Sequence, residues 1–88
     1  MKVVAKKSFN RDIEKIASVK LARNVKRTII EIENADNIHQ LSNVKKLKGH
    51  ANAFRIKIGS YRLGFILNNG IIELVAFIHR KDVYRYFP

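Results

Sequence analysis

The feature that most restricts the fold is an alternation in the C-terminal half, in which every second residue is apolar. It runs through AFRIKI at 53–58 and, after a short break, resumes in YRLGFILN at 61–68. A period of two is typical of strands that bury one face. Gly-Ser at 59–60 is a two-residue turn of the kind that hairpins favour, and Asn-Gly at 69–70 is a second turn signal. With the apolar run 71–78, the sequence predicts a three-stranded antiparallel meander.

The first turn sets the pairing of the first two strands. If residues 59–60 form the loop, Ile58 pairs with Tyr61 on the buried face, and Lys57 lies across from Arg62 on the other face, beside Arg55. Like charges directly opposite each other destabilise a strand pair. The hairpin contains no Asp or Glu that could offset them. Three cations on one sheet face are therefore interpreted as a site for phosphate.

The second turn extends this face onto the third strand. If residues 69–70 form the loop, Arg62 pairs with Phe77, which predicts His79 on the cationic face and Arg80 at its edge. Tyr84 follows shortly afterwards. Cations interleaved with aromatic rings are typical of sites for single-stranded RNA, because charge holds the backbone and rings stack on bases.

The N-terminal half predicts a short strand near residues 2–7 and two helices. Asn10 is expected to cap the first helix, with Asp12 in its first turns, where the helix dipole favours negative charge. Ser18 is expected to cap the second helix. Its apolar stripe has helical spacing and consists of Leu21, Val25, Ile29 and Ile32.

Asn34, Asp36 and Asn37 are expected to end the second helix. Residues 39–47 are expected to form a further helical turn or a loop. Together these elements predict an α+β fold in which two N-terminal helices pack on a twisted, mainly antiparallel sheet of about four strands. Residues 1–88 are expected to form a single domain, because the chain is too short for two cores.

The net charge of the chain indicates what kind of partner it binds. Eighteen Lys and Arg against seven Asp and Glu give a formal net charge of +11. Such a charge destabilises a folded domain by self-repulsion, and it is usually tolerated where the partner is a polyanion. There is no Cys, and no window approaches the roughly 18 apolar residues of a membrane span. We therefore expect a soluble, cytoplasmic protein with an anionic partner and no membrane contact.

The run from residue 45 to residue 88 resembles the C-terminal half of the RelE/ParE toxins of bacterial toxin–antitoxin pairs. The resemblance rests on Leu-Lys-Gly at 47–49, Arg-x-Lys-x-Gly-x-Tyr-Arg at 55–62 and His-Arg-x-x-Val-Tyr at 79–84. It implies the RelE-like microbial RNase fold. For the RelE-like branch it implies a toxin that enters the A site of the 30S ribosomal subunit and cuts mRNA without a metal or other cofactor, by attack of a 2′-hydroxyl on the adjacent phosphate.

The same resemblance implies roles for individual residues. Lys57 is the candidate general base, and Arg55 and Arg62 are candidates to stabilise the charge of the phosphorane. Arg80 would assist the leaving 5′-oxygen, and Tyr84 would orient or stack on the substrate. Because an arginine keeps its proton, the role of base falls on Lys57 or on a neutral His79. Contacts to RNA or phosphate are further expected from Lys45, Lys46, Lys48, His79, Lys81 and Arg85.

Both branches of the family imply a cognate antitoxin, expected to be a small acidic chain, and operator DNA is expected to be bound only through that antitoxin. Two other functions stay open. A ParE-like member poisons DNA gyrase by binding and has no nuclease activity, whereas a basic RNA-binding module binds RNA without cutting it. For Lys45, Lys46 and Lys48, an equal alternative to RNA contact is a position near a helix C-terminus, where the dipole favours cations.

Overall fold

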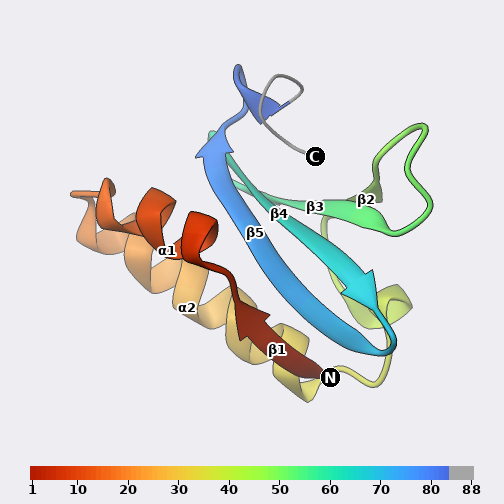
Figure 1. Cartoon of the computed structure of the whole chain (residues 1–88). Helices are drawn as coiled ribbons and strands as arrows, with labels where there is room; N and C mark the ends of the chain where they lie inside the picture. The colour runs from red at the N-terminus through yellow and green to blue at the C-terminus, as the bar shows by residue number, and fades with distance from the viewer. Residues whose placement is uncertain (84–88) are drawn as a thin grey trace.

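In the computed structural model, which describes residues 1–83, two helices cover one face of a five-stranded sheet (Figure 1). The sheet has the order β1-β5-β4-β3-β2, with β1 parallel to β5 and every other pair antiparallel. The predicted α+β fold is confirmed. The helices are α1 (Lys7–Glu14), α2 (Val19–Asn34) and a 3₁₀ turn (Ile38–Gln40), and the strands are β1 (Lys2–Ala5), β2 (Val44–Lys46), β3 (Ala53–Ile58), β4 (Tyr61–Asn68) and β5 (Ile71–His79).

Strand β2 is the element that the sequence did not predict. It follows the 3₁₀ turn, lies at the edge of the sheet and pairs antiparallel with β3, so that Lys45 lies opposite Arg55. Three residues are too few to show an alternating pattern, and this strand is defined by its pairing with β3. The alternative that placed Lys45, Lys46 and Lys48 near a helix C-terminus is therefore wrong, because they lie on an edge strand and in the loop after it.

The two helices begin differently from one another. Helix α1 starts directly after β1, where the Lys6 amide donates to the Leu74 carbonyl (2.9 Å), so the prediction that Asn10 caps it is wrong. Helix α2 starts as predicted, with the Ser18 hydroxyl accepting from the Leu21 amide (3.1 Å), and it ends at Asn34. Its predicted stripe packs on the sheet: Val25 and Ile32 are buried, and Leu21 and Ile29 are partly buried against the same core.

The pairing of β3 with β4 matches the prediction, including Ile58 opposite Tyr61 and Lys57 opposite Arg62. The pairing of β4 with β5 begins as predicted but contains a bulge at Val75, so that Arg62 lies opposite Ile78. The predicted pairing of Arg62 with Phe77 is therefore wrong.

A physical reason for the bulge is the burial of Phe77. A one-residue slip turns every following side chain to the opposite face of a sheet. In the bulged register Phe77 is 2% exposed and stacks on Tyr61, with ring centroids 5.1 Å apart. Without the extra residue this ring would lie on the face away from the helices.

Side chains of α1 complete the edge of β5 beyond the end of β1. Strand β1 pairs with β5 only as far as Leu74. After that point the Ser8 hydroxyl donates to the Val75 carbonyl (2.6 Å), and the Asp12 carboxylate accepts from the Phe77 amide (3.0 Å). Asp12 lies in the second half of α1, not in its first turn. Its side chain therefore acts as a substitute for a neighbouring strand at the bulge.

Replacing Asp12 by alanine is expected to lower the free energy of unfolding by about 1–3 kcal/mol, because the partly buried Phe77 amide loses its acceptor. Thermal denaturation followed by circular dichroism measures this loss. Glu14→Ala removes the same charge from an exposed position of the same helix and serves as the control. Equal losses in the two variants would show that the hydrogen bond is not the cause.

Candidate phosphate-binding site on the sheet

The face of the sheet away from the helices carries a small cavity of about 170 Å³. We call it the cationic pocket. Its lining comes from β2, β3, β4 and the residue before β2, and consists of Asn43, Lys45, Arg55, Lys57 and Arg62. The register explains this grouping, because Lys45 lies opposite Arg55 and Lys57 opposite Arg62. Gly64, which lies opposite Arg55 on the other side, has no side chain to fill the space.

The guanidinium of Arg62 is held at the β3–β4 turn. Its Nη1 donates to the carbonyls of Gly59 (3.1 Å) and Tyr61 (2.9 Å), and the residue is half-buried. Both bonds use a single nitrogen of a group that has five N–H donors. The charge is thus oriented by the backbone, and the remaining donors can still engage a phosphate.

Arg80 lies at the same end of the sheet as this turn. Its backbone amide donates to the Ser60 carbonyl (2.9 Å), and its side chain is exposed. In Figure 1 the end of β5 meets the β3–β4 turn at the top of the sheet. The backbone of Arg80 therefore lies beside the turn that holds Arg62, but Arg80 is not among the residues that line the cationic pocket.

His79 lies on the other face, and the prediction that placed it with the cations is wrong. It pairs with Tyr61, and the two rings meet edge to face with centroids 5.4 Å apart. Its Nδ1 accepts from the amide of Lys81 (3.2 Å), and the histidine lines a separate cavity of about 210 Å³ together with Asp12 and Asp82. The bulge in β5 causes this reversal, because it shifts the alternation by one residue.

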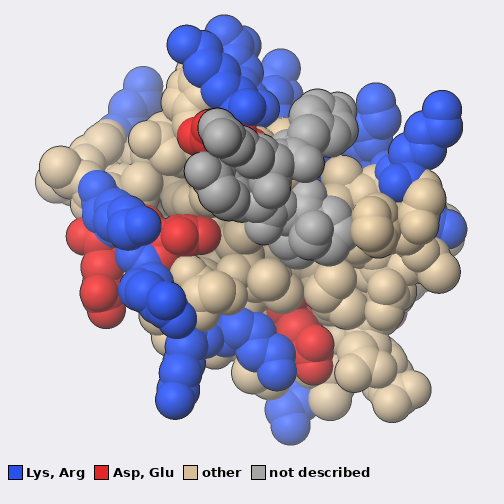
Figure 2. Space-filling model, turned by 45° about the horizontal axis from the view of Figure 1, so that its top comes forward, with Lys and Arg blue, Asp and Glu red and all other residues tan. Residues whose placement is uncertain are grey.

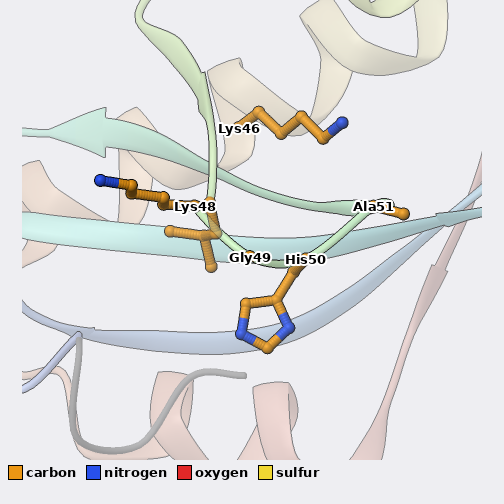
Figure 3. Close-up of a pocket in the computed structure, with 6 residues that line it drawn as sticks. Lys46, Lys48, Gly49, His50 and Ala51 are labelled. Atoms are coloured by element: carbon orange, nitrogen blue, oxygen red, sulfur yellow. The ribbon is translucent and has the colours of Figure 1, made fainter.

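Lys46 and Lys48 are also absent from the lining of the cationic pocket. Lys46 lies opposite Phe54 and so faces away from Lys45. The two lysines line a surface hollow of about 520 Å³ with Gly49 and His50, and Figure 3 shows their ammonium groups pointing to opposite sides. Lys81 is exposed in the turn after β5. The predicted site residues Tyr84 and Arg85 lie outside the described residues.

Positive charge is not confined to the pocket. Figure 2 shows Lys and Arg side chains at the top, the upper right, the lower left and the bottom of this view, with the acidic side chains in a few small groups between them. This agrees with the net charge of +11. A field of this kind attracts polyanions at long range but is screened within about 10 Å at 0.1 M salt. Long-range attraction therefore follows from the net charge of the chain, whereas the pocket provides a defined arrangement of cations.

Within residues 1–83, no helix combines the length and the apolar character needed to cross a membrane. The same residues bring together no group of three His, Asp or Glu side chains that could hold a metal ion.

No protein-family model matches the chain, but comparison with individual proteins finds a curated relative and similar solved structures. Toxin RelE3 of Methanocaldococcus jannaschii is 35% identical over 89 residues, and the match covers 100% of both chains. A chain of the RelB–RelE antitoxin–toxin complex from Methanococcus jannaschii superposes with a TM-score of 0.82 at 30% identity, over 97% of this chain and 99% of that one. A chain of the RelBE2 toxin–antitoxin complex from Mycobacterium tuberculosis gives a TM-score of 0.60 at 20% identity, over 90% and 96%. At this lower identity the likeness shows the fold alone.

Proposed function

This chain belongs to the RelE family and is the toxin of a type II toxin–antitoxin system; from this premise we propose that it inhibits translation by cutting mRNA in the ribosomal A site. The observation that carries the proposal is the cationic pocket, in which Lys57, Arg55 and Arg62 share one sheet face. On a surface that only faces water, like charges directly opposite each other on paired strands destabilise the sheet and serve no purpose. In a site for phosphoryl chemistry, the same cations stabilise the extra negative charge of the pentavalent phosphorus.

In the proposed reaction the 2′-hydroxyl of one nucleotide attacks the adjacent phosphate. Lys57, in its neutral form, takes the proton of that hydroxyl, while Arg55 and Arg62 offset the charge that develops on the phosphorane oxygens. The bond to the 5′-oxygen then breaks. This oxygen departs beside Arg80 and takes a proton from water, which leaves a 2′,3′-cyclic phosphate and a 5′-hydroxyl. The reaction as proposed needs no metal, because side chains supply the positive charge.

Adding the purified protein to a translation extract and mapping mRNA ends by primer extension tests the proposal. Cuts that follow the reading frame are expected. A gyrase supercoiling assay run in parallel examines the alternative, and gyrase inhibition with intact mRNA would contradict the nuclease proposal. Salt-dependent RNA binding without cleavage would instead identify a binding module.

Because His79 lies on the face opposite the cationic pocket, we expect Lys57, and not His79, to be the general base. Lys57→Ala is expected to slow cleavage by about 10²- to 10⁴-fold. His79→Asn keeps an acceptor for the Lys81 amide but cannot act as a base, and it is expected to remain within about threefold of wild type. Single-turnover cleavage in the same extract compares the two variants. A large loss in His79→Asn with little change in Lys57→Ala would reverse the assignment.

We also infer a cognate antitoxin as the partner of this chain, since the similar chain from Methanococcus jannaschii, at 30% identity, comes from an antitoxin–toxin complex. An acidic antitoxin segment would be complementary in charge to the basic surface of the toxin. Operator DNA would then be bound through the antitoxin. With the ribosome and mRNA as its proposed targets, we propose that residues 1–88 act as a single domain in the cytoplasm.

A further inference from the structure

One residue that lines the cationic pocket differs in chemistry from the other four. Lys45, Arg55, Lys57 and Arg62 are cations, and lysine and arginine side chains donate hydrogen bonds but accept none. Asn43, the fifth, carries an amide that both donates and accepts. Phosphate is the same in every nucleotide, so side chains that are engaged with phosphate do not distinguish sequences. Base edges present donors and acceptors together, and single-stranded RNA exposes them. Asn43 has no proposed role on the phosphate, and its amide can both donate to and accept from a base edge.

The backbone fixes Asn43 beside the candidate base. Its carbonyl accepts from the Lys57 amide (3.3 Å), and the next residue, Val44, begins β2 by pairing with Ile56. The residue itself is exposed. Its position relative to the phosphate-binding cations is thus set by the sheet, while its side chain is accessible to a nucleotide bound in the pocket.

The backbone conformation of Asn43 offers a competing explanation for the choice of residue. Its φ of 61° lies in the left-handed region, which Asn tolerates better than most residues. Asn69 has the same property, with φ 51°, but lies in the β4–β5 turn and does not line the cationic pocket. The two asparagines therefore form a matched pair that separates backbone tolerance from a function in the pocket.

We propose that Asn43 is a specificity-determining residue, whose amide reads the base edge of a nucleotide next to the phosphate that is cut. The inference rests on the proposed mRNA cleavage and adds to it a source of sequence preference. A single well-formed contact of this type discriminates between bases by about tenfold or more. Arg55, Lys57 and Arg62 hold the phosphate regardless of base, and Asn43 selects among the nucleotides that reach them.

The test maps cleavage in a translation extract programmed with an mRNA pool that presents all four bases on either side of the cut. Asn43→Gly removes the amide and retains the left-handed backbone. In this variant the ratio of cuts between the most and least favoured bases is expected to fall by about tenfold, equivalent to about 1.4 kcal/mol. Asn69→Gly makes the same backbone change outside the pocket and is expected to keep the wild-type ratio. Circular dichroism confirms that both variants are folded.

The possible results separate this inference from the function on which it rests. Cleavage by Asn43→Gly with the wild-type base preference overturns the role of Asn43 alone. Loss of all cleavage in a folded Asn43→Gly variant also overturns it, because a residue that only selects bases is not required for every cut. Failure of the wild-type chain to cut mRNA removes the proposed function itself and the inference with it.

Discussion

Arg62→Ala is expected to lower mRNA cleavage by about 10²- to 10³-fold, which is the loss typical when one fixed charge stabiliser of a transition state is removed. The size of the effect follows from the fixed position of the guanidinium. Its bonds to the Gly59 and Tyr61 carbonyls orient the charge toward the pocket before substrate arrives. Alanine at this position leaves Lys57 without its opposite cation. Primer-extension mapping with time points measures the rate.

Arg23→Ala is the matched control for this experiment. Arg23 is exposed on α2, and its removal lowers the net charge by the same single unit. If cleavage depended on diffuse attraction of RNA, both variants would lose similar activity, and both losses would shrink at high salt. We expect Arg23→Ala to stay within about threefold of wild type. Arg62→Lys is expected to recover only part of the lost rate, because an ammonium lacks the planar fork that engages two groups at once.

The hairpin was predictable in full because two independent signals agree on it. The alternation in β3 and β4 determines which residues are buried, and the Gly59-Ser60 turn determines the pairing. Either signal alone would allow a slip by one residue. Since Lys57 and Arg62 meet through this register, the centre of the cationic pocket followed from sequence as well.

The bulge in β5 was not predictable from the same kind of reasoning. The run 71–78 is apolar almost throughout, so it contains no alternation that could show where the phase changes. The bulge is stabilised by contacts from outside the sheet, namely the packing of Phe77 on Tyr61 and the bonds from Ser8 and Asp12. The bulge also removes His79 from the proposed cleavage site, because it turns this side chain to the face opposite the cations.

The start of α1 and the presence of β2 were missed for a related reason. Helix α1 begins where β1 ends because the Lys6 amide is engaged by β5, and no capping residue marks that point. Strand β2 exists through its pairing with β3, and that pairing brings Lys45 and Asn43 to the pocket. Features fixed by partners distant in the sequence leave little trace in local composition.

Phe65→Ala is expected to have the largest effect on stability, with a loss of about 3–5 kcal/mol in the free energy of unfolding. Phe65 is 0% exposed, and its ring stacks on Phe54 with centroids 5.3 Å apart. Alanine leaves a cavity at the centre of the core between sheet and helices, which the neighbouring strands can close only in part. For a domain of this size the loss corresponds to a fall in melting temperature of roughly 12–40 °C.

Calorimetry on Phe65→Ala and Ile30→Ala tests this expectation. Ile30 is 47% exposed on α2, and its truncation is expected to change stability by less than about 0.5 kcal/mol. A similar small change in Phe65→Ala would contradict a tightly packed core. The result also bears on the pocket, because the strand that buries Phe65 presents Arg62 on its other face. Below its lowered melting temperature, Phe65→Ala should therefore still cut mRNA, whereas Arg62→Ala should be folded but about 10²- to 10³-fold slower.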